Sequence, residues 1–206
     1  MTWLKICGIT RAEDAELCHG AGADAIGFIF APSIRQVTFA QAYSICRAVP
    51  AILKVGVFVD APLQQVQQQR RQLGLDIIQL HGRESNDYCR QLGGVVIKAL
   101  RPQSAIDLQD IDRYIDVWKI LVDAYSPGRM GGTGQEVTAA ILHGIRDFSR
   151  IILAGGIGPD NAKAIVDALR PYGLDSSSRL EATPGVKDHE KIKSLCTLVK
   201  GPAYEE

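Results

Sequence analysis

The sequence lacks the features that mark membrane, secreted and nucleic-acid-binding proteins. No apolar run approaches the ~20 residues of a membrane-spanning helix. The N-terminus has no basic segment followed by a long apolar one, as a secretory signal would. No run of Lys or Arg exceeds two residues, and the formal net charge is zero. Charge therefore gives no reason to expect nucleic acid or a membrane as a partner.

The spacing of the cysteines suggests no disulfides. The five cysteines are odd in number and form no C-x-x-C pair, a pattern typical of free thiols in a reducing compartment. We therefore expect a cytoplasmic protein whose thiols are mostly buried. No group of His, Cys and Asp has the spacing of metal ligands, so no metal is predicted.

The length and composition are those of an ordinary globular protein. At 206 residues, with 46% hydrophobic and 22% charged residues, the chain suits a single domain that spans residues 1–206. A chain of this size buries roughly 70% of its unfolded surface, so it needs no disulfide or metal to stabilise it. No linker rich in proline, glycine or serine divides it.

Short β-branched runs alternate with helical segments along the whole chain. Most runs begin roughly 20 to 30 residues after the previous one, which is the length of one βα unit. The eight predicted strands are Leu4–Cys7, Ala25–Phe30, Lys54–Val59, Ile77–Leu80, Val95–Ala99, Trp118–Val122, Ile151–Ala154 and Leu174–Ser176.

Helix signals occupy the gaps between these strands. Thr10 and Thr38 are each followed three residues later by Glu or Gln, the spacing of a capping box. The glutamine-rich segment Gln64–Gln72 keeps apolar residues on one side, so we interpret it as a solvated helix. A further helix is expected somewhere within Gln103–Ile115. Cys196 shares an apolar helix face and is interpreted as a core residue.

Strict βα alternation predicts a parallel sheet with right-handed crossovers. An open doubly wound sheet would need only about five or six strands. Eight βα units in about 200 residues fit a compact α/β fold, the (β/α)8 TIM barrel, better. We therefore predict the barrel and keep the open sheet as the alternative.

Residues with useful chemistry stand where the predicted strands end. In a (β/α)8 barrel, active-site groups lie at the carboxyl ends of strands and in the loops that follow. This rule selects a thiol, two carboxylates, a guanidinium, two glycines and two hydroxyls. The candidate site residues are Cys7, Arg35, Asp123, Gly155, Gly156, Asp175, Ser177 and Ser178.

The loops after the seventh and eighth strands have the composition of a phosphate site. Gly155 and Gly156 let backbone amides approach an anion, and Ser177 and Ser178 add hydroxyl and amide donors. This pair of loops is the usual position of a phosphate in the fold. A glycine turn without a ligand is the alternative, and either loop alone would not decide between them, but the two loops together favour phosphate.

Other motifs exclude further functions. The glycine cluster Gly128–Gln135 lacks the G-K-[ST] ending of a nucleotide-binding loop, so we expect a flexible lid or a wall of the site rather than an ATP site. The sequence contains no G-x-S-x-G motif, so a serine hydrolase is not indicated. His81 could reach the mouth of the barrel, but we interpret it as a hydrogen-bonded structural histidine.

Cys7 and Asp123 form a candidate acid–base pair. A thiolate can take a proton and a carboxylic acid can give one, if both pKa values lie near neutrality. Strand alternation puts Lys5 on the same face as Cys7, so we hypothesise that Lys5 lowers the pKa of that thiol. A structural buried ion pair is the alternative role for Lys5.

Eight motifs spread over nearly the whole chain match one known family. They are KICGIT (Lys5–Thr10), GFIF (Gly27–Phe30), VGVFVD (Val55–Asp60), IQLHG (Ile78–Gly82), LVDAYSPGRMGGTG (Leu121–Gly134), LAGGI (Leu153–Ile157), GLDSSS (Gly173–Ser178) and PGVKD (Pro184–Asp188). Together they resemble the phosphoribosylanthranilate isomerase family of tryptophan biosynthesis.

The resemblance implies a (β/α)8 barrel that performs an Amadori rearrangement without a metal or cofactor. The implied substrate is N-(5-phosphoribosyl)anthranilate, and the implied product is 1-(2-carboxyphenylamino)-1-deoxyribulose 5-phosphate. By the same resemblance, Asp123 is the general acid on the ring oxygen and Cys7 is the general base at C2. Arg35 matches the residue that holds the anthranilate carboxylate, a task suited to its planar fork. Gly155, Gly156, Ser177 and Ser178 match the phosphate grip.

The sequence departs from the family pattern at two places. Arg179 stands where the family has glycine after the two serines, and Gln135–Val137 replaces a more common aromatic-acidic helix start. A positive φ at position 179 would strain an arginine. Two other functions stay open at this stage: the sister sugar isomerase of histidine biosynthesis, and a phosphate-ligand binding protein without catalysis. The sequence also leaves a monomer or a homodimer open.

Overall fold

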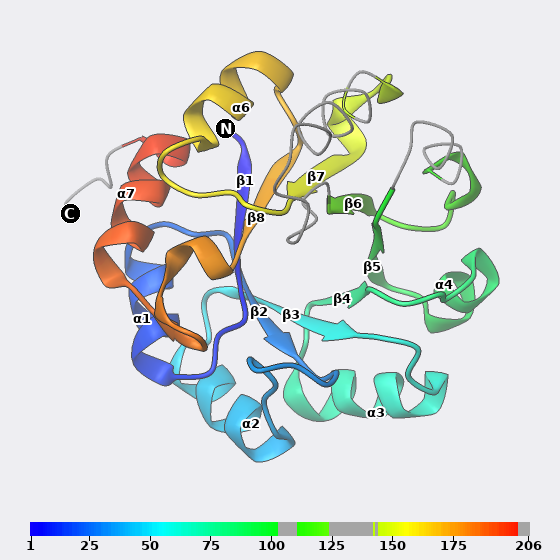
Figure 1. Ribbon diagram of the computed structural model, residues 1–206. Helices are drawn as coiled ribbons and strands as arrows, with labels where there is room; N and C mark the ends of the chain where they lie inside the picture. The colour runs from blue at the N-terminus through cyan, green and yellow to red at the C-terminus, as the bar shows by residue number, and fades with distance from the viewer. Residues whose placement is uncertain (103–110, 124–141, 143, 202–206) are drawn as a thin grey trace.

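Eight parallel strands close into a barrel in chain order (Figure 1). The computed structural model describes residues 1–102, 111–123, 142 and 144–201. Each strand begins and ends within one residue of its predicted bounds, so the predicted barrel is confirmed and the open sheet is wrong. The strands are β1 (Trp3–Cys7), β2 (Ala25–Ile29), β3 (Leu53–Phe58), β4 (Ile77–Leu80), β5 (Val95–Leu100), β6 (Lys119–Asp123), β7 (Ile151–Ala154) and β8 (Gly173–Ser176).

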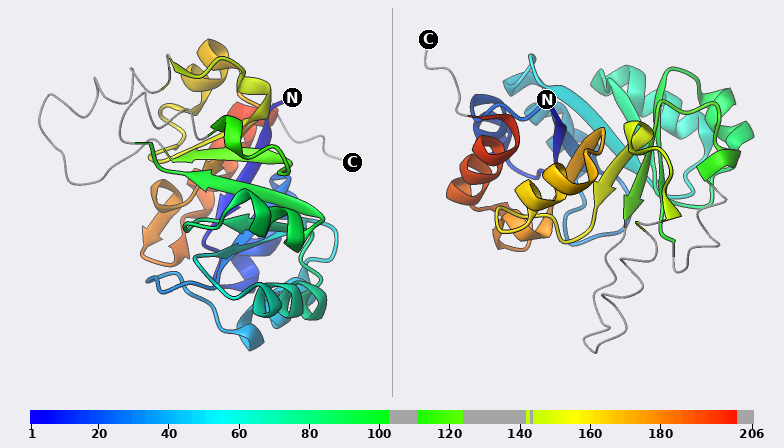
Figure 2. Two further views of the ribbon diagram at one scale, coloured as in Figure 1. Left: turned by 90° about the vertical axis from the view of Figure 1, so that its right-hand side faces the viewer. Right: turned by 90° about the horizontal axis from the view of Figure 1, so that it is seen from above.

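Helices surround the barrel (Figures 1 and 2). Within the described ranges, none is long and apolar enough to cross a membrane. The helix expected within Gln103–Ile115 lies mostly outside those ranges, as do Gly128–Gln135 and Gln135–Val137; residues 111–113 form a 3-10 turn. The α-helices are α1 (Ala12–Gly20), α2 (Phe39–Ala48), α3 (Leu63–Leu73), α4 (Asn86–Leu92), α6 (Ala162–Leu169) and α7 (His189–Lys200).

The core has two layers, because each strand turns alternate side chains inward and outward. The outward side chains pack under the helices, and Cys196 of α7 lies there, as predicted. The inward ones form a smaller cluster inside the barrel. At its amino end, Trp118 packs edge-on against Trp3 and Tyr172, with ring centroids 5.8 and 5.3 Å away. Aromatic rings therefore fill the end of the barrel opposite the strand termini that carry chemistry.

One of the two predicted capping boxes is present. Thr38 accepts a hydrogen bond from the Gln41 amide at 3.2 Å, and the Gln41 side chain accepts one from the Thr38 amide at 2.8 Å. The prediction at Thr10 is wrong. Its hydroxyl donates to the Gly185 carbonyl at 2.5 Å, and α1 begins after Arg11 without a side-chain cap. The Thr10 hydroxyl thus bonds to a residue that is distant in sequence and does not cap the helix.

A two-stranded hairpin follows β8 and was not predicted. Its strands are β9 (Glu181–Thr183) and β10 (Val186–Lys187), paired antiparallel. Gly185 in the turn has φ +82°, a left-handed conformation that glycine adopts without strain. The hairpin places Glu181 and Lys187 beside the carboxyl end of the barrel.

A buried ion pair fixes the loop that follows β4. Lys98 Nζ lies 2.8 Å from Glu84 Oε2 and donates to the Gly82 carbonyl at 2.6 Å. The other oxygen of Glu84 accepts the Asp60 amide at 2.8 Å. Both side chains are almost fully buried, so breaking the pair would leave an uncompensated charge. The network therefore holds the backbone next to His81 in place.

Gly27 of β2 provides a test of the packing inside the barrel. A Cβ built there would lie 2.9 Å from both Cys7 Sγ and Lys5 Cε. We predict that Gly27→Ala lowers the free energy of unfolding by about 1–3 kcal/mol, because the added methyl overpacks this layer. Urea unfolding measures the change.

The matched control is Gly20→Ala at the end of α1, where a Cβ would meet nothing within 4 Å. This variant should be neutral or slightly stabilising. Equal stability of the two variants would contradict the packing described here.

Candidate active site

A cavity of about 570 Å³ opens at the carboxyl end of the barrel. Its wall contains side chains from β1, β4 and β6 and from the loops after β2, β7 and β8. All eight residues selected from the sequence line this one cavity: Cys7, Arg35, Asp123, Gly155, Gly156, Asp175, Ser177 and Ser178. The strand-end rule thus selected groups that the fold brings together.

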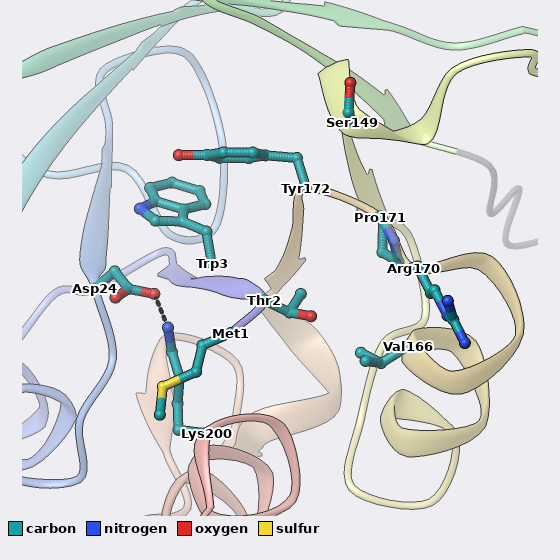
Figure 3. Close-up of a pocket in the computed structure, with 10 residues that line it drawn as sticks. All are labelled: Met1, Thr2, Trp3, Asp24, Ser149, Val166, Arg170, Pro171, Tyr172 and Lys200. Carbon is teal, nitrogen blue, oxygen red and sulfur yellow. Dashed lines mark hydrogen bonds and ion pairs between the residues drawn. The ribbon is translucent and has the colours of Figure 1, made fainter.

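A second cavity of about 570 Å³ lies at the amino end of the barrel (Figure 3). Trp3 and Tyr172 face it, and Asp24 is paired with Lys200 beside it. Asp24 also accepts the Leu4 amide at 2.6 Å, so its carboxylate ties α7 to β1. Equal volume therefore does not decide between the cavities. The carboxyl-end cavity is the candidate because it holds Cys7, the carboxylates of Asp123 and Asp175, and the loops predicted to bind phosphate.

The floor of the carboxyl-end cavity is a buried ion pair between β1 and β8. Lys5 Nζ lies 2.8 Å from both carboxylate oxygens of Asp175, and the two residues are register partners. Lys5 is fully buried, and Asp175 is only 8% exposed. The structural role considered for Lys5 is therefore present, and Asp175 contacts the cavity from below.

Cys7 stands directly above this pair. Burial raises the pKa of the Cys7 thiol, and the Lys5 charge opposes that rise without cancelling it. Lys187 acts in the same direction as Lys5, whereas the Asp175 carboxylate adds to the rise. The expectation that Lys5 favours the thiolate therefore holds in direction, but the net pKa of Cys7 lies above its ordinary value.

Asp123 ends β6 and lines another part of the cavity wall. Arg101 Nε lies 3.4 Å from Asp123 Oδ2, and His81 Nε2 lies 3.8 Å from the same oxygen. Burial, together with the charge of Arg101, lowers the pKa of His81 to about 3, so the imidazole is neutral near pH 7. The contact between His81 and Asp123 is thus not an ion pair.

Gln79 and His81 also line the cavity; His81 was expected to be able to reach the mouth but was interpreted as structural, and Gln79 was not predicted. Gln79 Nε2 lies 3.4 Å from His81 Nδ1, within hydrogen-bond distance. Gln79 Oε1 and His81 Nε2 are buried and have no hydrogen-bond partner among the described residues. Inward alternation along β4 was the signal that could have found Gln79.

The two loops predicted to bind phosphate lie side by side. Gly155 and Gly156 have φ of +89° and +65°, which glycine adopts without strain. Asn161 braces this loop, donating to the Gly156 carbonyl and accepting from the Gly158 amide, both at 2.9 Å. On the other loop, the Ser177 hydroxyl donates to the Cys7 carbonyl at 3.0 Å. The phosphate candidates are therefore linked directly to the backbone of the candidate base.

Arg179 causes no backbone strain at the position where the family has glycine. Only Asp60 and Arg170 combine a side chain with a positive φ in the described part of the chain. Arg179 lies in a short 3-10 turn (Ser178–Leu180), lines the cavity and is paired with Asp160 of the neighbouring loop. The substitution thus adds a cation at the rim of the phosphate loops.

Arg35 is held by the hairpin after β8. Its Nε and Nη2 donate to Glu181 Oε1 and Oε2 at 2.6 and 2.7 Å. Lys187 lies 3.4 Å from the same Glu181 and donates to the Ser177 carbonyl at 3.1 Å. Burial alone would raise the pKa of Glu181, but Arg35 and Lys187 bring it below its ordinary value. Glu181 is therefore an ionised carboxylate between two cations.

A sequence model of the family described as N-(5'phosphoribosyl)anthranilate (PRA) isomerase matches residues 4–197. The chain belongs to this isomerase family. It is an N-(5'-phosphoribosyl)anthranilate isomerase of tryptophan biosynthesis and converts phosphoribosylanthranilate to the carboxyphenylamino-deoxyribulose phosphate. The resemblance stated from the motifs is confirmed.

Relatives and solved structures agree with this family over the full chain. The isomerase of Desulforudis audaxviator is 43% identical over 203 residues, which cover 97% of this chain and 98% of that protein. The crystal structure of the Thermotoga maritima isomerase has a TM-score of 0.86 at 35% identity, covering 98% of this chain and 100% of that one.

Two further structures bear on ligands and assembly. A phosphoribosyl anthranilate isomerase solved with the reduced product, a carboxyphenylamino-deoxyribulose phosphate, has a TM-score of 0.84 at 33% identity, covering 98% and 100% of the two chains. Monomers generated from the dimeric Thermotoga maritima enzyme have a TM-score of 0.83 at 32% identity, with the same coverage.

The isomerase should show the effect of Lys5 on the thiol directly. We predict that Lys5→Met moves the pKa of Cys7 further up, because the cation that favours the thiolate is lost. Absorbance at 240 nm, taken as the difference from Cys7→Ala, follows the thiolate against pH. The pH profile of kcat/KM should shift to higher pH by the same amount.

If the single variant does not fold, the same titration is made on the double variant Lys5→Met, Asp175→Asn, which leaves no unpaired buried charge. Lys163→Met, at an exposed lysine of α6, is the matched control and should titrate as wild type. A Cys7 titration that is the same with and without Lys5 would disprove the effect.

Proposed function

We propose that Cys7 is the general base and Asp123 the general acid of the isomerisation. The observation that carries the proposal is their placement: Cys7 ends β1 and Asp123 ends β6, and both line the one cavity that also holds the phosphate loops. A proton donor and a proton acceptor on different walls can act on different atoms of one bound substrate.

The proposed reaction has two proton transfers. Asp123 gives its proton to the furanose ring oxygen, the bond between C1 and that oxygen breaks, and the nitrogen lone pair forms the C1=N bond. The Cys7 thiolate then takes the proton from C2, and that electron pair forms C1=C2 and neutralises the nitrogen. The enolamine becomes the ketone by losing the proton on O2 and gaining one at C1. Exchange with solvent returns Cys7 and Asp123 to their starting states.

Two anchors for the ends of the substrate support this arrangement. The glycine and serine loops after β7 and β8 suit the phosphate, because their amides and hydroxyls converge without bulky side chains. Arg35 suits the aromatic carboxylate, since a guanidinium binds a carboxylate through two parallel hydrogen bonds. Holding both ends fixes C1 and C2 between Cys7 and Asp123.

The reading as a binding protein without catalysis rested on Arg179. Because Arg179 has no positive φ and lies at the cavity rim, the reason for that reading is removed. The ligand we propose is the phosphorylated small molecule alone, without nucleic acid, membrane or cofactor. The dimeric relative supports a homodimer as one form, alongside the monomer. Five unpaired thiols support a cytoplasmic location.

Loss of either proposed group should slow the reaction without unfolding the protein. We predict that Cys7→Ala and Asp123→Asn each lower kcat by about 10²–10⁴-fold, as expected when a general acid or base is removed. Decay of anthranilate-type fluorescence, with substrate generated in situ, measures the rate. Circular dichroism shows whether each variant is folded.

Asp167→Asn, at an exposed carboxylate of α6, is the matched control and should keep the wild-type rate. Folded Cys7→Ala and Asp123→Asn proteins that retain full activity would place the chemistry elsewhere in the cavity.

A further inference from the structure

The contact between Arg35 and Glu181 uses only one of the two edges of the guanidinium. A guanidinium has two edges that can each bind a carboxylate: one formed by Nε and one Nη, the other by the two Nη atoms. Glu181 takes the edge formed by Nε and Nη2, with distances of 2.6 and 2.7 Å. Nη1 and the second Nη2 hydrogen make up the remaining edge.

Glu181 approaches Arg35 from outside the cavity. Arg35 is among the residues that line the cavity, and Glu181 is not. The Glu181 side chain is only 6% exposed, whereas that of Arg35 is 20% exposed. The carboxylate therefore lies on the side of the guanidinium away from the cavity, and it leaves the edge formed by the two Nη atoms to a second carboxylate.

The charges around Glu181 leave a net positive cluster. Glu181 is shared by Arg35 and by Lys187, whose side chain is fully buried. Two cations thus share one carboxylate, so pairing does not cancel the attraction of Arg35 for a second carboxylate. Lys187 also donates to the Ser177 carbonyl, which fixes the cluster relative to the phosphate loop.

The stem of Arg35 is fixed as tightly as its head. Gly8, directly after Cys7, has φ +74°, and a Cβ there would lie 2.7 Å from Arg35 Cδ. Arg35 therefore packs on the bare backbone next to Cys7 while Glu181 sets the rotation of its guanidinium. An arginine held at both ends loses little conformational freedom when it binds a ligand.

We propose that Glu181 is a positioning residue: it holds one edge of the Arg35 guanidinium from behind, so that the other edge is presented to the aromatic carboxylate of the substrate. The proposal rests on the proposed role of Arg35. It makes Glu181 and Lys187 determinants of specificity for a carboxylated aromatic ring, although neither touches the substrate.

The test compares two ligands that differ in one group. The first is the reduced product analogue, and the second is the same compound with phenyl in place of carboxyphenyl. For Glu181→Gln we expect binding of the carboxylated analogue to weaken about tenfold, as for a misplaced charge-assisted pair, and binding of the other analogue to stay within about twofold. KM should rise about tenfold, with kcat changed less than about threefold.

A merely structural role predicts a different result. Disturbing the phosphate loop would weaken both analogues equally, and tighter binding of the carboxylated analogue would mean that Glu181 competes for Arg35; either result overturns the proposal. Glu181→Asp keeps the charge but shortens the side chain, so it should show the same selective loss if Glu181→Gln does not fold. Glu190→Gln, at an exposed carboxylate of α7, is the matched control.

Arg35→Met separates this proposal from the one on which it rests. If Arg35→Met loses discrimination between the analogues and Glu181→Gln does not, only the positioning role is wrong. If Arg35→Met binds both analogues as wild type does, Arg35 is not the carboxylate ligand and both proposals fail.

Discussion

The ion pair of Lys5 and Asp175 is the constraint on which the rest of the site depends. It joins the first and last strands at one level of the barrel, where neither side chain is accessible to solvent for more than 8% of its surface. Removing one partner of such a pair typically costs about 3–5 kcal/mol, because the other charge is left buried and alone. The pair therefore fixes the seam between β1 and β8, which lie side by side in Figure 1, and with it the strand that carries Cys7.

Charge at this end of the barrel is arranged around two buried carboxylates. Asp175 engages Lys5, and Glu181 engages Arg35 and Lys187. Each carboxylate sets the position of a cation and lets that cation act on something else: the thiol in one case, a ligand in the other. Because these charges are paired with one another, polar residues can occupy the interior of a barrel whose other layers are aliphatic and aromatic.

The sequence allowed prediction of what depends on local pattern, and little of what depends on distant pairing. Eight β-branched runs at regular spacing predicted every strand of the barrel, and the rule of strand ends selected Cys7 and Asp123. The hairpin after β8 was not predicted, because strands of two and three residues are too short to show alternation of apolar and polar residues. Glu181 lies 146 residues from Arg35, and Gly185 lies 175 residues from Thr10, so neither pairing could be predicted from the local sequence.

The hydrogen bond from Ser177 to the Cys7 carbonyl spans 170 residues of chain. A ribosome adds about 5–20 residues per second, so Cys7 is made roughly 10–30 s before the hydroxyl that bonds to it. During translation the thiol therefore has neither Asp175 below it nor Ser177 beside it. A nascent chain that stops before β8 carries Cys7 without the rest of the cavity, so the proposed chemistry has to await synthesis of the last strand.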